Sequence, residues 1–201
     1  MTTTRDRILD GALAVMRERG LARTTTKEIA RASRLSEAAL YKFFTDKEDL
    51  FLCVLKERLP KISVIEDDSA DAVGRASLEE GLRAMIEQIE RFYEESLPIA
   101  MSLFSDAALL AQHRQSLGPK GAGPEAVVQR VSAYLRAEQT AGRISPGAPV
   151  AGAAAALVGA SMHQAFLRCY QGTGRQKDLL GATSSEIAEA IVASLTNRSS
   201  D

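Results

Sequence analysis

The sequence predicts an all-α protein, and three observations lead to that prediction. The 201 residues are 45% hydrophobic and 25% charged, which is ordinary for a folded globular chain. Aromatic residues make up only 5%, Trp is absent and alanine is frequent, a composition that favours helices over β-sandwiches or barrels. Apolar residues recur at helical spacing in successive segments, and several segments begin with Thr or Ser followed by Glu three residues later.

The first sixty residues contain four predicted helices. The first covers 5–19, with Thr4 as its cap and Gly20 at its end. The TTKE sequence at 25–28 is a capping box and predicts a short helix over 26–32. Ser36 is expected to cap a third helix over 37–43. The TDKE sequence at 45–48 repeats the pattern and opens a fourth helix, which Pro60 ends or kinks.

The remaining residues predict further helices separated by polar segments. Ser77 and Glu80 form another capping box, and the Ser96-Leu97-Pro98 sequence is expected to begin a new helix. The glycine- and proline-rich residues 118–124 predict a flexible loop, after which Pro124 opens a helix. The last two predicted helices cover about 149–171 and 184–197. We therefore expect two domains, 1–59 and 60–201.

The charges are unevenly distributed between these two parts. Residues 1–60 carry 12 Lys and Arg against 9 Asp and Glu, a balance of +3, whereas residues 61–201 carry 13 against 17, a balance of −4. A basic head on an acidic body is consistent with a polyanionic partner for the head.

One uncharged stretch needs to be tested as a membrane span. From Ile144 to Leu167 there is no Asp, Glu, Lys or Arg, over 24 positions. This length can cross a bilayer, but the stretch is rich in Ala and Gly and contains His163 and Gln164, which lipid would penalise. We therefore do not expect this stretch to insert into a membrane. A helix of small residues that is apolar on most faces is instead expected to pack in a homodimer seam, together with the last helix, or alternatively in the core of one chain.

No pattern in the sequence indicates catalysis, a cofactor or a metal. Cys53 and Cys169 are far apart and lie in no metal-binding spacing, so free thiols in a reducing, cytoplasmic compartment are expected. His113 and His163 fall on different helices without a carboxylate pattern. No nucleophile–base pair, phosphate loop or carboxylate pair is evident, and the N-terminus has no apolar signal run.

The short second and third helices, joined by a three-residue turn, match a helix-turn-helix that reads DNA. Its expected core is formed by Ile29, Ala30, Leu35, Leu40 and Phe44. Tyr41 and Lys42 would then be exposed, where a phenol and an ammonium can bind phosphates or a guanine edge. Lys27 and Lys47 each occupy the second position of a predicted helix, where a cation is unfavourable unless an anion binds there.

The segment TTKEIARASRLSEAALYKFFTDKEDLF, residues 25–51, resembles the DNA-binding signature of the TetR family of bacterial repressors. The resemblance covers residues 5 to about 59. It implies an all-helical homodimer, a C-terminal domain that binds a small effector, and release of double-stranded operator DNA when the effector binds. By resemblance, Thr26, Lys27, Tyr41 and Lys47 fall on positions that contact the DNA backbone. Positions near base edges correspond to Glu37, Ala38, Ala39 and Lys42.

The turn departs from the family pattern. The family usually has glycine where this chain has Arg34, and a left-handed conformation is costly for a residue with a Cβ atom. The turn is thus expected to be reshaped or strained, or Arg34 is an added phosphate contact. With Arg34 and Ser36 included, the predicted DNA-contact set comprises Thr26, Lys27, Arg34, Ser36, Glu37, Ala38, Ala39, Tyr41, Lys42 and Lys47.

An effector pocket is expected in the C-terminal part. Its predicted lining is apolar with one titratable group, which favours an uncharged, apolar small molecule. The residues are Met85, Ile89, Phe92, Met101, Phe104, His163 and Phe166. Three functions remain open: a ligand-responsive repressor, a DNA-binding activator or effector-free regulator, and a helical bundle that binds or converts small molecules without a DNA function.

Overall fold

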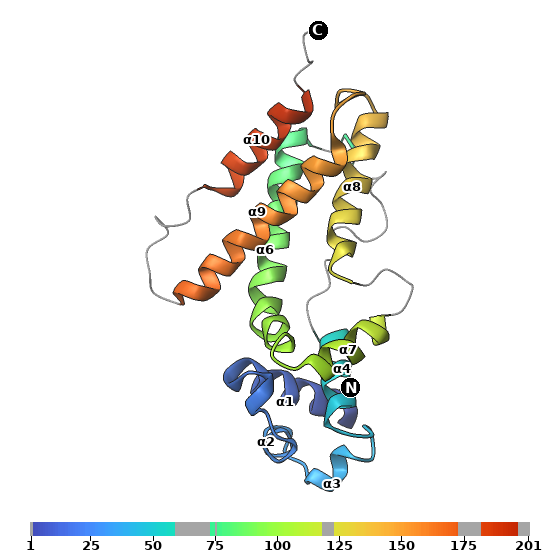
Figure 1. Ribbon diagram of the computed structural model, residues 1–201, viewed down its shortest axis with the longest axis vertical. Coiled ribbons are helices and arrows are strands. Elements are labelled where there is room, and N and C mark those ends of the chain that lie inside the picture. Colours follow the sequence, from blue (N-terminus) through green and yellow to red (C-terminus); the bar gives the residue numbers. More distant parts are fainter. Residues whose placement is uncertain (1, 59–72, 75, 118–122, 173–181, 197–201) are drawn as a thin grey trace. The chain divides into compact units, whose positions relative to one another are not determined.

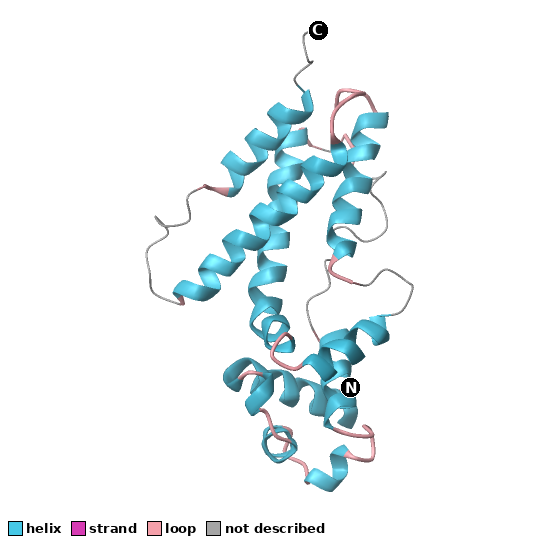
Figure 2. Ribbon diagram, in the orientation of Figure 1, coloured by secondary structure: helices cyan, strands magenta, loops and turns pink. Residues whose placement is uncertain are grey.

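All regular elements in the described part of the chain are helices (Figure 2), as the sequence predicts. The computed structural model describes residues 2–58, 73–74, 76–117, 123–172 and 182–196. Contacts divide the chain into two units. The head unit comprises Met1–Pro60 and Glu95–Lys120, and the body unit comprises Lys61–Glu94 and Gly121–Asp201. Residues 95–120 thus group with residues 1–60, and the division into a DNA-binding domain of residues 1–59 and an effector-binding and dimerisation domain of residues 60–201 stays a prediction.

The head unit begins with helix α1, Thr4–Arg19, which contacts both α2 and α4. A single 3-10 turn, Leu21–Arg23, leads into α2, Thr26–Ala32. Helix α3, Glu37–Leu40, and helix α4, Lys47–Glu57, follow. The last residues of α6 and helix α7, Ala107–Leu117, complete the unit. The head core is formed by side chains from all these helices, among them Ile8, Leu9, Met16, Ile29, Leu40, Phe44, Phe51, Val54, Ile99 and Leu109.

Two helix starts differ from the sequence prediction because a nearby carboxylate decides the cap. Thr3, not Thr4, caps α1, since its hydroxyl accepts from the Asp6 N–H and the Asp6 carboxylate accepts in return. Asp46, not Thr45, caps α4 through the Asp49 N–H at 2.7 Å. Ser36 occupies the cap position of α3 but makes no side-chain capping hydrogen bond.

Helix α6, Leu78–Leu103, corrects a larger prediction. The sequence placed a new helix at Ser96-Leu97-Pro98, but α6 is continuous and Pro98 lies inside it. Proline has no N–H, so the carbonyl of Glu94 loses its helical donor. The Cys169 thiol donates to that carbonyl at 3.5 Å, which partly replaces the missing hydrogen bond. The capping box of Ser77 and Glu80 at the start of α6 is confirmed.

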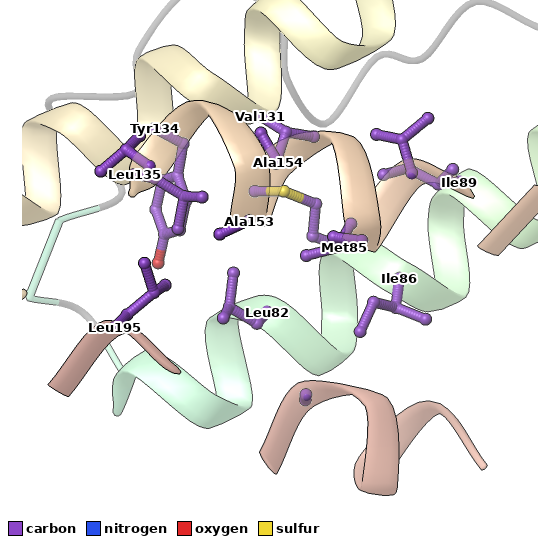
Figure 3. Close-up of a cluster of buried hydrophobic side chains, with 14 of the residues drawn as sticks. Leu82, Met85, Ile86, Ile89, Val131, Tyr134, Leu135, Ala153, Ala154 and Leu195 are labelled. Atoms are coloured by element: carbon purple, nitrogen blue, oxygen red, sulfur yellow. The ribbon is translucent and has the colours of Figure 1, made fainter. Parts of the chain in front are cut away.

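The body unit packs the first part of α6 with α8, Glu125–Thr140, α9, Val150–Gln171, and α10, Ser184–Thr196. In Figure 1, α9 runs between α8 and α10, and it contacts both. Figure 3 shows Leu82, Met85 and Ile86 of α6 among apolar side chains of α8 and α9. The predicted loop at 118–124 lies mostly outside the described residues, as does the connector after Pro60.

Two buried carboxylates of the body unit are neutralised by arginines. Arg143 donates to both oxygens of Glu138, at 2.6 and 2.7 Å. Burial raises the pKa of Glu138, but hydrogen bonds from Arg143 and Tyr134 outweigh it and leave the pKa below its ordinary value. Arg168 donates to Glu90 at 2.6 Å and also bonds Glu94, which ties α9 to α6. The interior of the body unit therefore holds charge only as satisfied pairs, in the part of the chain described.

Helix α9 is long and apolar enough to cross a membrane by length and composition. Its inner residues, such as Ala154, Leu157 and Ser161, are fully buried against the neighbouring helices. A core helix of a globular unit passes the same test of length and composition, and that is the role α9 has within the body unit. The opposite face of α9 is exposed and is made of small or apolar residues: Gly152, Ala155, Ala156, Gly159, Met162, His163 and Phe166.

Candidate nucleic-acid interface

The position of α3 is fixed by two buried side chains. Helix α3 has only four residues, and an isolated helix of that length is not stable in water. Leu40 at its end and Phe44 just beyond it are 1% and 3% exposed and belong to the head core. Burial of these two residues leaves the intervening Tyr41, Lys42 and Phe43 as a turn with outward side chains. The predicted helix over 37–43 is therefore too long by three residues.

The turn between α2 and α3 contains one left-handed residue. Arg34 has φ 55° and is the only non-glycine residue with positive φ in the described part of the chain. The turn closes through the Leu35 N–H, which donates to the Ala30 carbonyl at 2.9 Å. Arg7 of α1 donates to the Ser33 carbonyl at 2.8 Å and holds the turn against α1. The sequence prediction of strain at Arg34 is thus matched by the backbone conformation.

Most of the predicted DNA-contact set is exposed and lies in one continuous segment, from α2 to the start of α4. Lys27, Arg34 and Lys42 are exposed, and Tyr41 is 52% exposed. Ser36, Glu37 and Ala38 are exposed as well, whereas Thr26, Ala39 and Lys47 are half-buried. Ile29, Ala30, Leu40 and Phe44 are buried as predicted, and Leu35 packs against them while half-buried. Contact of this set with DNA stays a prediction.

The cations of the head unit fall into two groups. Arg5 of α1 and Arg58, which follows α4, are paired: Arg5 donates to both Glu57 oxygens at 2.7 Å, and Arg58 binds Asp6 and Asp10 at 2.5 and 2.7 Å. These bonds join α1 to α4. By contrast, in the segment 26–44 the described residues give no ion pair to any of its basic side chains, which are Lys27, Arg31, Arg34 and Lys42.

The acids of the paired group titrate accordingly. The Thr3 hydroxyl, the Arg58 guanidinium and the Thr3 N–H together lower the pKa of Asp6 to about 2. A hydrogen bond from Arg5 is the largest cause that lowers the pKa of Glu57. These carboxylates remain ionised, and their positive partners are not available to a polyanion. Positive charge that can meet phosphate is therefore concentrated on the helix-turn-helix segment.

The two helix-start lysines are not equivalent. Lys27 is the second residue of α2, as predicted, and is exposed. Lys47 is the first residue of α4, not the second, and its Nζ lies 5.0 Å from the centroid of the Phe51 ring. Asp46, Glu48 and Asp49 surround this helix start, and Asp46 already uses one free N–H. The acids offset the unfavourable interaction of Lys47 with the helix dipole, so that interaction alone does not call for an anion.

One hydrogen bond joins α2 to α3 through the predicted set. The hydroxyl of Thr26, the first residue of α2, donates to Oε1 of Glu37, the first residue of α3. Both residues were predicted to contact DNA, but the sequence gives no sign that they bond each other. Nor did sequence reasoning include Arg31, which is exposed, or Phe43, which is 44% exposed beside Lys42. The basic charge of Arg31 was available as a signal, whereas the exposure of Phe43 was not.

The predicted effector residues are not brought together by the structure into one cluster. Met85 and Ile89 are buried in the body core, and Phe92 packs against it. Met101 and Phe104 belong to the head unit and are 50% and 69% exposed. His163 and Phe166 are exposed on α9. Their assignment to a ligand pocket stays a prediction.

A cavity of about 200 Å³ lies in the head unit, between the start of α4 and the junction of α6 with α7. Its lining includes Lys47, Glu48, Phe51, Ser102 and Asp106. None of the predicted effector residues lines it. Within the described residues, no group of three or more His, Cys, Asp or Glu side chains is placed to hold a metal ion.

Comparison with known proteins identifies the head. Residues 8–54 match the family model described as "Bacterial regulatory proteins, tetR family". The match runs from α1 to α4 and does not extend into the C-terminal part of the chain. The HTH-type transcriptional repressor AcnR of Corynebacterium glutamicum is 31% identical over 101 residues, 50% of each chain. The HTH-type transcriptional regulator YvkB of Bacillus subtilis is 35% identical over 72 residues, 35% of this chain and 38% of its own. The chain spans at most about half the length of these curated relatives.

Solved structures extend the likeness to nearly the whole length of the chain. A TetR-family transcriptional regulator from Mesorhizobium loti superposes with a TM-score of 0.74 at 23% identity, covering 96% of this chain and 97% of the other. The regulator FadR from Bacillus subtilis, in complex with stearoyl-CoA, has a TM-score of 0.67 at 19% identity, with 94% and 98% covered. At these identities the likeness establishes the fold: a helix-turn-helix head with a helical C-terminal part.

The left-handed turn gives a prediction with two independent readouts. Arg34→Gly should raise the free energy of unfolding by about 0.5–1 kcal/mol, because relief of left-handed strain exceeds the greater flexibility of glycine in the unfolded chain. If Arg34 also contacts phosphate, the same change weakens DNA binding. Arg34→Ala is the matched control, since it removes the charge but keeps the Cβ atom. Equal stability of the two variants in urea denaturation would contradict the strain.

Proposed function

We propose that the protein is a DNA-binding transcriptional regulator that acts as a repressor, binds a near-palindromic operator as a homodimer, and is released by a small apolar effector. The observation that carries the proposal is the set of unpaired, exposed cations at 26–44, on a helix-turn-helix held by Leu40 and Phe44. The name of the relative AcnR, a transcriptional repressor, supports the direction of regulation.

Binding to DNA follows from what each exposed group can donate. Lys27, Lys47 and the Tyr41 hydroxyl suit phosphate oxygens, which fix the protein on the duplex without reading its sequence. Lys42, at the turn that follows α3, suits a guanine edge in the major groove. Arg31 and Arg34 add positive charge to the same segment, and each phosphate contact strengthens the dependence of affinity on salt.

Dimerisation is supported by the exposed face of α9. Gly152, Ala156 and Gly159 form a row of small residues at helical spacing, and a Cβ atom built on either glycine meets nothing within 4 Å. Such a row permits close approach of a second helix, and α10 lies beside α9 within the body unit. His163 and Phe166 continue this face, so we assign them to the seam and not to the pocket. A two-fold dimer presents two recognition segments to one operator.

The interior of the body unit supports an effector that is apolar and uncharged. Its buried carboxylates, Glu90 and Glu138, are already engaged by Arg168 and Arg143, and the surfaces of Met85 and Ile89 are apolar. The complex of the FadR protein with stearoyl-CoA supports a helical body that accepts small molecules. We expect the protein to remain a binding protein without enzymatic activity and to act in the cytoplasm, where the operator is.

DNA binding by the full chain is tested with labelled duplexes from upstream of its own gene. Lys47→Ala and Tyr41→Phe should weaken operator and random DNA alike, and Lys47→Ala should reduce the salt slope by about 1. Lys42→Ala should narrow the ratio between operator and random DNA. Lys56→Ala, an exposed lysine near the end of α4, is the control. The assignment of roles is wrong if all three variants keep the same operator-to-random ratio.

The dimer seam is tested with Gly159→Arg. The new side chain meets open space in a single chain, so only association should suffer, and sedimentation equilibrium should show a monomer with weakened operator binding. Ala133→Arg, at an exposed position of α8, introduces the same group elsewhere on the body unit and should leave the dimer intact. A stable monomer for the unmodified protein would remove this part of the proposal.

The effector is tested by its reciprocity with DNA. A compound found by thermal-shift screening of uncharged apolar molecules should lower operator affinity about 5- to 150-fold, and saturating operator must weaken binding of the compound by the same factor. Calorimetric titration with and without operator measures both. A compound that binds the protein equally well with and without operator DNA is not an inducer. A screen that yields only such compounds favours a regulator without an effector.

A further inference from the structure

Of the two carboxylates in the segment 26–44, Glu28 pairs with Arg19, whereas Glu37 lies among the exposed cations. Glu37 is the first residue of α3, is exposed, and has no ion pair with Lys or Arg within the described residues. Its Oε1 accepts the hydrogen bond from Thr26, eleven residues earlier in the chain. The carboxylate is therefore held by a neutral hydroxyl, although Lys27, Arg31, Arg34 and Lys42 lie in the same segment.

An acid at this place has a cost for a protein that binds DNA. A carboxylate that approaches a duplex is repelled by the phosphates, and it can accept hydrogen bonds but cannot donate them. It stabilises a helix start through the helix dipole, but α3 has four residues and that effect is correspondingly small. A favourable contact with a base edge would offset the repulsion and make the acid useful.

The bases differ in what they offer to such an acceptor in the major groove. Guanine presents two acceptors and thymine one acceptor and a methyl group, so neither can bond a carboxylate. Adenine presents an amino donor, but the lone pair of its neighbouring N7 acceptor repels the negative charge of the carboxylate. Cytosine presents the N4 amino donor alone. Because Oε1 already accepts from the Thr26 hydroxyl, we expect the other carboxylate oxygen of the exposed Glu37 to be the acceptor that meets this single donor.

We propose that Glu37 selects a cytosine at one position of each operator half-site, and that Thr26 is the positioning residue that orients its carboxylate. This inference rests on the DNA-binding function proposed above. Thr26 then contributes to sequence reading through Glu37, in addition to any contact of its own with the DNA backbone.

The test selects sequences from a random duplex library with the full chain and with Glu37→Gln. The unmodified protein should favour cytosine at one symmetric position, with a loss of about 5- to 150-fold when that pair is replaced. Glu37→Gln should shift the preference at that position alone to adenine, because an amide both donates to N7 and accepts from the N6 amino group. It should also bind random DNA more tightly, since one repulsive charge is gone.

Substitutions of Thr26 separate orientation from stability. Thr26→Val keeps the shape of the side chain without its hydroxyl. It should weaken the cytosine preference several-fold and leave the base preference at the other operator positions unchanged. Thr26→Ser keeps the hydroxyl and should retain the cytosine preference. An unchanged base preference in both Glu37→Gln and Thr26→Val would overturn the inference and leave the regulator function standing. If the unmodified protein enriches no sequence at all, the proposed function itself fails.

Discussion

The arrangement of the exposed residues between α2 and α4 depends on the burial of Leu40 and Phe44 in the head core. A four-residue helix has no stability of its own, so these two anchors, together with the packing of α1 against α2 and α4, decide where the neighbouring polar side chains lie. The same anchors explain why the segment can carry repulsive features. Unpaired cations and a left-handed arginine are tolerated because apolar burial elsewhere in the head offsets their cost.

Charge in the protein is used in two ways that the structure keeps apart. Arg5 and Arg58 form ion pairs with carboxylates, and these pairs join α1 to α4. Arg143 and Arg168 neutralise buried acids in the body unit. The basic residues of 26–44 have no such partners in the described residues. Since the net charge of the whole chain is only −1, the attraction for a polyanion must come from this local separation and not from the overall balance.

Much of the fold could be predicted from the sequence, because capping boxes and apolar spacing are local signals. The Thr25–Glu28 box and the range of α2 are as predicted, and of the alternatives for the turn, reshaped or strained, the left-handed Arg34 fits the strained one. The failures have non-local causes. Helix α6 continues through Pro98, and the Glu94 carbonyl that the proline leaves without a helical donor accepts a hydrogen bond from Cys169 of α9. Helix α3 ends early because Phe44 is buried in the head core. The bond between Thr26 and Glu37, and the exposure of Met101 and Phe104, likewise depend on packing that no local pattern encodes.

The central claim is that residues 26–47 form the DNA-binding surface, and hydrogen–deuterium exchange of the full chain with and without operator duplex tests it most directly. The account predicts slower exchange on operator binding in peptides that cover 26–47, because bound DNA shields the backbone of this segment and stabilises the short α3. Peptides from the interior of α8 should change little. Slowing confined to α8, or no change in 26–47 at saturating operator, would contradict the account.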